Sequence, residues 1–188
     1  GGDPVAGAET SVESPEVDLS SGIVLLDYSD RWKYNDQNKN LGTAWRKNDY
    51  NDASWKSGGG LLGVENAGLP GPGLKRRINK GYQLTYYFRK EFKFNSDPTG
   101  VTLKIDQIID DGAVYYLNGE EVGRSRVNGN VNFNTTSSAT VGDAKEERGV
   151  VTIDSGLKRG SNVLAVEVHQ TNRTSSDIVF GCRVRASM

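Results

Sequence analysis

Two adjacent carboxylates, Asp110 and Asp111, are the strongest chemical signal in the sequence. Neighbouring negative charges repel each other unless a cation, an arginine or several backbone N–H groups compensate them. Calcium prefers several oxygen ligands, and adjacent carboxylates supply them, so this pair is a candidate metal site. The alternative needs no metal: one aspartate caps the tight turn that follows, and the other pairs with Arg89 in a neighbouring strand.

His169 is the single histidine of the chain, and it ends an apolar run beside Gln170. One histidine cannot build a histidine-rich metal site, and no G-x-S-x-G turn is present to expose a serine nucleophile. Ser175, Ser176 and Asp177 would imitate a hydrolytic triad with His169 if the last two strands pair. We interpret this set as a hydrogen-bonded cluster that holds the connecting loop, because buried polar groups at strand ends need partners.

Three aromatic residues, Trp45, Tyr50 and Trp55, are candidates for stacking against a sugar. The apolar face of a pyranose packs on an aromatic ring while its hydroxyls bond to nearby polar side chains. The alternative is that the tryptophans fill the open end of a β-sandwich, an interpretation that we favour for Trp32 and Trp55 because large aromatics usually belong to cores.

The elements that would position these residues are strands. Residues 113–118 alternate between two faces and end in Asn118-Gly119, the dipeptide that favours a tight hairpin onto residues 121–124. Further strands are predicted at residues 23–27, 84–94, 101–107, 150–153, 162–169 and 178–184. No sustained helical period with a cap is present. The sequence therefore predicts an all-β jelly-roll β-sandwich of about eight antiparallel strands.

Composition narrows the possible functions. The 188 residues suit one domain, residues 23–188, preceded by a Gly-, Ser- and Pro-rich disordered linker over residues 1–22. The formal net charge of -1 provides no basic surface for nucleic acid. Cys182 is the single cysteine, so neither an intrachain disulfide nor a cysteine-based zinc site can form. No apolar run is long enough for membrane insertion, and no signal peptide is present in these residues.

Several segments taken together resemble the galactose-binding-domain-like jelly rolls, and in particular the accessory modules of bacterial secreted and surface proteins. The likeness covers roughly Ile23 to Ala186. The segments that carry it are Trp32-Lys-Tyr34, Trp45, Asp52-Ala-Ser-Trp55, Gly60-Leu-Leu-Gly63, Thr85-Tyr-Tyr-Phe-Arg89, Asp110 to Gly119, Gly160 to Gln170 and Ser175-Ser-Asp177. The strand that ends in Asn118-Gly119 also resembles the sugar-binding domain of family 2 glycoside hydrolases. Asp110-Asp111-Gly112 resembles the PA14 adhesin domains, in which two aspartates hold calcium.

The resemblance implies a non-catalytic carbohydrate-binding module that targets an attached secreted enzyme to a polysaccharide. The alternative is a structural spacer that binds no small ligand and packs against a catalytic domain. We expect a secreted or cell-surface bacterial location, a glycan and a neighbouring catalytic domain as partners, and structural calcium as a possible cofactor. The candidate carbohydrate-binding residues are Trp45, Tyr50, Trp55, Arg89, Asp110, Asp111, His169, Gln170 and Asp177, and the candidate metal ligands are Asp110 and Asp111.

Overall fold

The computed structural model of the protein describes residues 18–188, which form strands and one short 3-10 helix. The elements are β1 (Ile23–Leu26), β2 (Trp32–Asn35), η1 (Ala44–Arg46), β3 (Lys56–Gly58), β4 (Leu61–Val64), β5 (Leu74–Arg77), β6 (Thr85–Phe94), β7 (Thr102–Asp110), β8 (Gly112–Leu117), β9 (Glu120–Ser125), β10 (Glu146–Ile153), β11 (Gly160–His169) and β12 (Ile178–Ser187). Within this part of the chain, no helix has the length and apolar character needed to cross a membrane.

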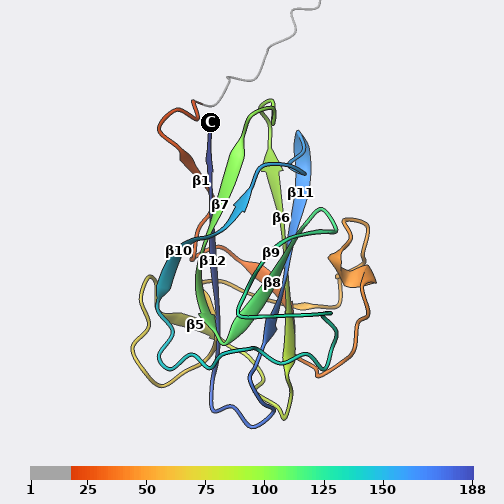
Figure 1. Cartoon of the computed structure of the whole chain (residues 1–188), viewed down its shortest axis with the longest axis vertical. Helices are drawn as coiled ribbons and strands as arrows, with labels where there is room; N and C mark the ends of the chain where they lie inside the picture. Colours follow the sequence, from red (N-terminus) through yellow and green to blue (C-terminus); the bar gives the residue numbers. More distant parts are fainter. Residues whose placement is uncertain (1–17) are drawn as a thin grey trace, which may run out of the picture.

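The strands form two sheets that face each other (Figure 1). The first sheet has the order β10-β7-β12-β4-β5, with β1 also paired to β12, and the second has the order β3-β2-β6-β11-β8-β9. Every pair is antiparallel except β4 with β5, which run parallel. The architecture confirms the predicted all-β, jelly-roll-like sandwich.

The core lies between the sheets and is formed by alternate residues of the long strands. Phe88 of the second sheet stacks on Phe180 of the first, with ring centroids 3.9 Å apart, and Trp32 meets Phe180 edge-on at 4.8 Å. The predicted hairpin is present as well. Asn118 and Gly119 have φ values of 52° and 94°, the positive angles that a tight turn between β8 and β9 requires.

A second apolar cluster covers the outer face of the second sheet. The long connection between β2 and β3 lies there, and its 3-10 helix places Trp45 against Tyr87 of β6 and Tyr116 of β8. The ring centroid of Trp45 is 4.8 Å from that of Tyr87 and 5.7 Å from that of Tyr116. Because both faces of the central strands are covered, β8 is buried along its whole length.

The structure differs from the prediction in two respects. Twelve strands rather than about eight lie within residues 18–188, since β2 to β5 have only three or four residues each and are too short for alternation to identify. Of the predicted 1–22 linker, residues 1–17 lie outside the described part of the chain. The remainder forms a turn, in which Leu19 is buried against the core.

Three strands of the first sheet meet at one end of the sandwich, and their register decides which polar residues become neighbours. Ile178 at the start of β12 pairs with Val64 at the end of β4, and Val179 pairs with Asp110 at the end of β7. This end lies opposite the C-terminus, which follows the other end of β12 (Figure 1).

Candidate functional site

The predicted sugar-stacking residues are largely enclosed. Trp45 has 0% of its surface exposed and Trp55 has 9%, while Tyr50 is half-buried with its ring centroid 5.9 Å from that of Trp55. A sugar can stack only on a ring face that solvent reaches. The prediction that Trp45 is a stacking platform is therefore wrong for this conformation, because the ring completes the apolar cover on the second sheet. Trp55 and Trp32 are buried too, as we favoured.

Arg89 lies beneath this aromatic cover and pairs with Asp52. Its Nε donates to Asp52 Oδ2 at 2.8 Å, and its Nη1 donates to the carbonyl oxygens of Trp45 and Lys47. Lys33 Nζ bonds the other carboxylate oxygen of Asp52 at 2.7 Å. Burial alone would raise the pKa of Asp52, but the hydrogen bonds and charges of Lys33 and Arg89 outweigh it and lower that pKa. The predicted pairing of Arg89 with one of the Asp110/Asp111 carboxylates is wrong.

A polar cleft of about 280 Å³ opens beside this ion pair. It is lined by Arg31, Lys33, Asp52, Arg89 and Glu91, among others. The Tyr50 ring lies next to it, with the Arg89 guanidinium carbon 5.4 Å from its centroid. The cleft offers hydrogen-bonding groups on the outer face of the second sheet, and the partly exposed Tyr50 ring lies against its lining residue Arg89.

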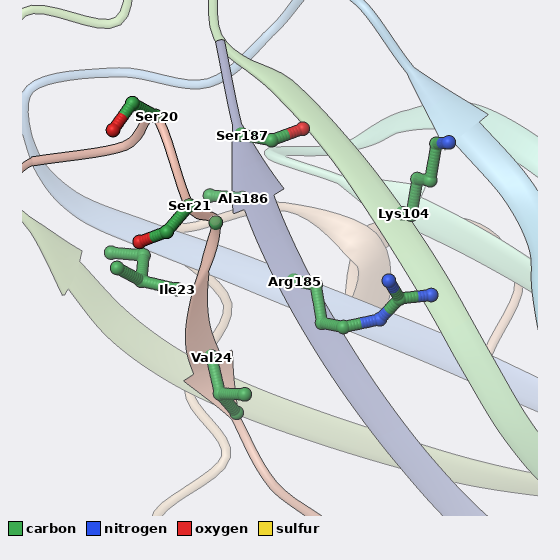
Figure 2. Close-up of a pocket in the computed structure, with 9 residues that line it drawn as sticks. Ser20, Ser21, Ile23, Val24, Lys104, Arg185, Ala186 and Ser187 are labelled. Atoms are coloured by element: carbon green, nitrogen blue, oxygen red, sulfur yellow. The ribbon is translucent and has the colours of Figure 1, made fainter.

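A different hollow of about 250 Å³ lies beside β1 and β12, near the C-terminal end of β12 (Figure 2). Figure 2 shows Arg185 extending from β12 toward β7, where its register partner Lys104 lies. The Arg185 guanidinium forms an ion pair with Asp106 at 2.6 Å. The remaining lining residues are small, hydroxyl-bearing or aliphatic, so this hollow supplies no aromatic ring for a pyranose.

His169 belongs to a buried network centred on Glu167. Tyr116 Oη donates to Glu167 Oε1 at 2.5 Å, and Arg46 Nη2 lies 3.1 Å from the same oxygen. His169 Nε2 is 3.3 Å from Glu167 Oε2, an ion-pair separation without hydrogen-bond geometry. Its Nδ1 lies 2.8 Å from the Thr135 carbonyl oxygen, which can only accept. We call Arg46, Tyr116, Glu167 and His169 the Glu167 cluster.

The Glu167 cluster keeps a buried carboxylate ionised. Burial alone would raise the pKa of Glu167, but the adjacent His169, followed by the Tyr116 hydrogen bond and the Arg46 charge, outweighs it and lowers that pKa. His169 is therefore occupied by a structural network, and the hydroxyls of Ser175 and Ser176 instead approach Asp177 Oδ1, each at 3.3 Å. The set predicted from the sequence is therefore divided in two, with His169 in the Glu167 cluster and the two serine hydroxyls beside Asp177.

Asp110 and Asp111 are both fully buried, but they have different surroundings. Asp111 Oδ1 accepts from the Val141 N–H at 2.7 Å, and Oδ2 accepts from the N–H and hydroxyl of Thr171 at 2.9 and 3.1 Å. Asp111 thus fastens two loops to the end of the sheet. Neither carboxylate oxygen of Asp110 has a hydrogen-bond partner. Both carboxylate oxygens of Asp111 are already bonded by loop groups, while the Asp111 side chain remains a direct neighbour of Asp110 and raises its pKa.

Besides Asp111, Asp110 meets two acidic residues from neighbouring strand ends. Carboxylate oxygens of Glu65, Asp110 and Asp177 lie within 4.8 Å of one another. Burial, and then the neighbouring carboxylates of Asp111, Asp177 and Glu65, raise the pKa of Asp110 to about 9. Burial and Glu65 also raise the pKa of Asp177. We call Glu65, Asp110 and Asp177 the Asp110 cluster.

Glu65 was not identified from the sequence. It follows the short strand β4, and no spacing pattern links it to Asp110 or Asp177. Only the order β7-β12-β4 in the first sheet makes the three residues neighbours. Gln170, which was predicted, lies beside this cluster: its Nε2 donates to the Asp177 carbonyl oxygen, and its buried Oε1 has no partner.

These features define the class of protein as a jelly-roll-like β-sandwich domain with an acidic cluster at one end of its first sheet. No protein-family model and no curated protein matches the sequence. Solved structures are similar in fold. A β-glucuronidase from glycoside hydrolase family 2 has a TM-score of 0.51 at 16% identity, covering 92% of this chain and 18% of that one.

Two further solved structures agree. A β-glucuronidase from Ruminococcus gnavus gives a TM-score of 0.54 at 12% identity, covering 92% of this chain and 30% of that one. A glycosyl hydrolase family 2 member from Bacteroides cellulosilyticus gives a TM-score of 0.50 at 15% identity, covering 86% of this chain and 20% of that one. The chain thus spans less than a third of each enzyme, and it has the fold of one part of them. The resemblance to family 2 glycoside hydrolases is confirmed at the level of fold.

Proposed function

We propose that the chain is a non-catalytic structural domain of a larger carbohydrate-active protein, in which it packs beside a catalytic domain. One observation carries this proposal: the large aromatic side chains are used for the domain's own packing. Trp45 and Trp55 cover the outer face of the second sheet instead of offering stacking surfaces. Such a covered sheet suits a rigid unit that supports a neighbour. Its secreted or cell-surface bacterial location is part of the proposal.

The buried acidic groups also support a non-catalytic role. A glycosidase needs two carboxyl groups that reach the scissile bond from opposite sides. Asp110 has 0% of its surface exposed, so it cannot contact a glycosidic oxygen, and Glu167 is bonded within the Glu167 cluster. The carboxylates that lie close together are therefore suited to holding the fold rather than to cleaving a sugar.

Hydrogen–deuterium exchange tests the structural role. Exchange is measured for the isolated chain and for the natural polypeptide in which it occurs. We expect a continuous set of exposed peptides to exchange more slowly in the longer protein, because the neighbouring domain covers them. Identical exchange of all peptides in the two forms would contradict the proposal, since a packed interface must protect some backbone amides.

Carbohydrate binding is the second candidate, favoured by the polar cleft beside Tyr50. Arg31, Lys33 and Glu91 at this cleft could bond sugar hydroxyls while the partly exposed Tyr50 ring contacts an apolar sugar face. A shallow site of this kind would gain its effect from attachment to an enzyme that acts on the same polysaccharide.

Isothermal titration with a panel of soluble polysaccharides tests this candidate. If the cleft binds glycan, Tyr50→Ala should weaken binding at least about tenfold, through the loss of one aromatic contact. Tyr82→Ala is the matched control, because Tyr82 is 67% exposed and its ring lies against Arg173, which does not line the cleft, whereas Tyr50 lies against the lining residue Arg89. Absence of heat with every polysaccharide, or equal losses in both variants, would remove this candidate and leave the structural role.

A further inference from the structure

The Asp110 cluster is built by the register of the first sheet. Asp110 is the last residue of β7, Asp177 directly precedes β12, and Glu65 directly follows β4. The pairs Ile178 with Val64 and Val179 with Asp110 fix these three strand ends beside one another. The three carboxylates therefore converge because ordered backbone holds them there, and not because exposed side chains happen to approach.

The cluster has no positive partner within the described residues. No ion pair between residues 18 and 188 includes Glu65, Asp110 or Asp177. Both oxygens of the fully buried Asp110 and the buried Oε2 of Glu65 also lack a hydrogen-bond partner. Burying carboxylates together without compensation costs several kcal/mol. A positive charge at this position would offset that cost.

Oxygen atoms without hydrogen-bond partners indicate where a positive charge would be bound. Glu65 Oε1 accepts the N–H groups of Asn66 and Ala67 at 2.6 and 2.7 Å, which fixes the carboxylate and leaves Oε2 free. The Gln170 amide is anchored through Nε2 to the Asp177 carbonyl, while its Oε1 is buried without a partner. Unused oxygen acceptors, one of them a neutral amide outside the acidic set, thus gather at one corner of the sandwich.

We propose that Glu65, Asp110 and Asp177 bind a divalent cation that prefers oxygen ligands, and that Ca²⁺ is the cation that fits best. The donors are all oxygens, the ligand type of hard cations, and no nitrogen or sulfur donor belongs to the set. The proposal does not depend on the proposed function of the domain.

Size favours calcium over magnesium. Two oxygens on one ion can be no further apart than twice the metal–oxygen distance, about 4.2 Å for Mg²⁺ and about 5.2 Å for Ca²⁺. The carboxylate oxygens of the cluster all lie within 4.8 Å of one another, so every separation is within the calcium limit. Calcium also tolerates irregular coordination by ligands that strand ends hold in place, whereas magnesium demands near-ideal octahedral geometry.

The bound cation would act as a cross-link. Glu65, Asp110 and Asp177 follow or precede strands that are adjacent in the sheet but distant in sequence. Joining them would fasten the loops after β4 and β11 to the end of β7, beside the loops that Asp111 holds through Val141 and Thr171. A structural ion at this position stabilises the folded state, because the unfolded chain does not bring the three ligands together.

Calcium titration of chelator-treated protein tests the proposal directly. Isothermal titration should give one Ca²⁺ per chain, and free Ca²⁺ at about 100 times its Kd should raise the Tm by roughly 5–10 °C. Magnesium at the same concentration should give a smaller rise. Glu65→Gln and Asp177→Asn should each weaken Ca²⁺ binding at least about tenfold, as should Asp110→Asn, since each removes one charged ligand.

Asp49→Asn is the matched control, because Asp49 is exposed and the variant makes the same change in charge; its calcium response should equal that of the unmodified chain. If Asp110→Asn does not fold, Glu65→Gln carries the test, since its amide oxygen can still accept from Asn66 and Ala67. If titration with Ca²⁺ gives no heat of binding and leaves the Tm unchanged, the proposal is overturned. A proton shared between the carboxylates would then compensate the cluster. Unchanged binding in both Glu65→Gln and Asp177→Asn would also overturn it.

Discussion

Two buried acidic groups in this protein solve the same electrostatic problem in different ways. Glu167, on the second sheet, is 2% exposed and has Tyr116, Arg46 and His169 around it. Asp110, on the first sheet, is 0% exposed and has only further carboxylates as charged neighbours among the groups that shift its pKa. Burial alone therefore does not distinguish the two sites, whereas the sign of the surrounding charge does.

The comparison separates a buried carboxylate whose charge the protein itself compensates from one whose charge it does not. In the Glu167 cluster the pKa of the carboxyl is lowered, so the protein itself stabilises the charge. In the Asp110 cluster the pKa of Asp110 is raised to about 9 by burial and neighbouring carboxylates, so the protein stabilises the neutral form instead. A buried carboxylate with no internal partner indicates where an external ion or proton is required.

The largest effect is expected from Glu167→Gln. The substitution leaves the buried His169 and the partly buried Arg46 without their carboxylate, so the free energy of unfolding should fall by about 3–5 kcal/mol. Urea denaturation measures this loss. Glu121→Gln is the control, because Glu121 pairs with Arg124 near the surface, and it should cost less than about 1 kcal/mol. Equal losses in the two variants would mean that the Glu167 cluster contributes no more than a surface ion pair.

Gly63→Ala should cause the next largest loss of stability, and it should disturb the Asp110 cluster. A Cβ at Gly63 would lie 2.0 Å from the Ile178 carbonyl oxygen, so β4 must move away from β12. We expect a loss of about 1–3 kcal/mol in denaturation and a weaker calcium response, because Glu65 would move relative to Asp177. At Gly68 a Cβ meets nothing within 4 Å, so Gly68→Ala is the neutral control. A normal calcium response in Gly63→Ala would show that the register does not position the ligands.

Acidification should affect the Glu167 cluster in a predictable direction. The folded pKa of Glu167 lies below its ordinary value of 4.5, so its stabilisation is complete above that value and is lost as the pH falls through the folded pKa. Denaturation between pH 5 and pH 3 should show falling stability, with a slope of at most about 1.4 kcal/mol per pH unit from this group. The slope should be smaller in Glu167→Gln. Some slope should persist, because Asp52 has a pKa that its partners Lys33 and Arg89 lower against burial.

The smallest effect, and the one with the opposite sign, is expected for Asp110→Asn in the presence of chelator. Without a cation the neutral form of Asp110 is the stabilised one, so the substitution replaces one neutral side chain by another of similar size, and the new amide can donate to Glu65 or Asp177. The free energy of unfolding should therefore stay unchanged or rise by about 1 kcal/mol, whereas it should fall in Glu167→Gln. Chemical denaturation of both variants in chelator makes the comparison. A loss above about 1 kcal/mol in Asp110→Asn would indicate that the Asp110 carboxyl group already has a stabilising partner within the protein.

The sequence predicted the secondary structure correctly where the conformation of a segment depends mainly on its own residues. Asn118-Gly119 predicts the β8–β9 hairpin, because the turn demands two positive φ angles that this dipeptide tolerates. The long strands β6 and β7 follow from alternation of residues over a length sufficient to detect it, and β11 follows from its apolar run. The short strands β2 to β5 were missed, because three or four residues do not establish a period.

The aromatic residues show where local reasoning fails. Trp45 and Tyr50 lie in a polar connection that resembles an exposed binding loop, and the sequence gives no sign of what the connection covers. The structure places it over Tyr87 and Tyr116, so Trp45 is buried by residues from two other strands. The exposure of a side chain depends on what packs against it, and that is a property of the tertiary structure.

By itself the sequence determined the fold class, the central hairpin and the importance of Asp110, because strand period, turn chemistry and adjacent carboxylates are local properties. Only the tertiary structure decided what Asp110 meets. The β7-β12-β4 order brings Glu65 and Asp177 to it, while loop N–H groups bond the carboxylate of the adjacent Asp111. The physical reason is that electrostatic interactions depend on distance in space and on burial, and the order of strands in a sheet, rather than spacing along the chain, sets both.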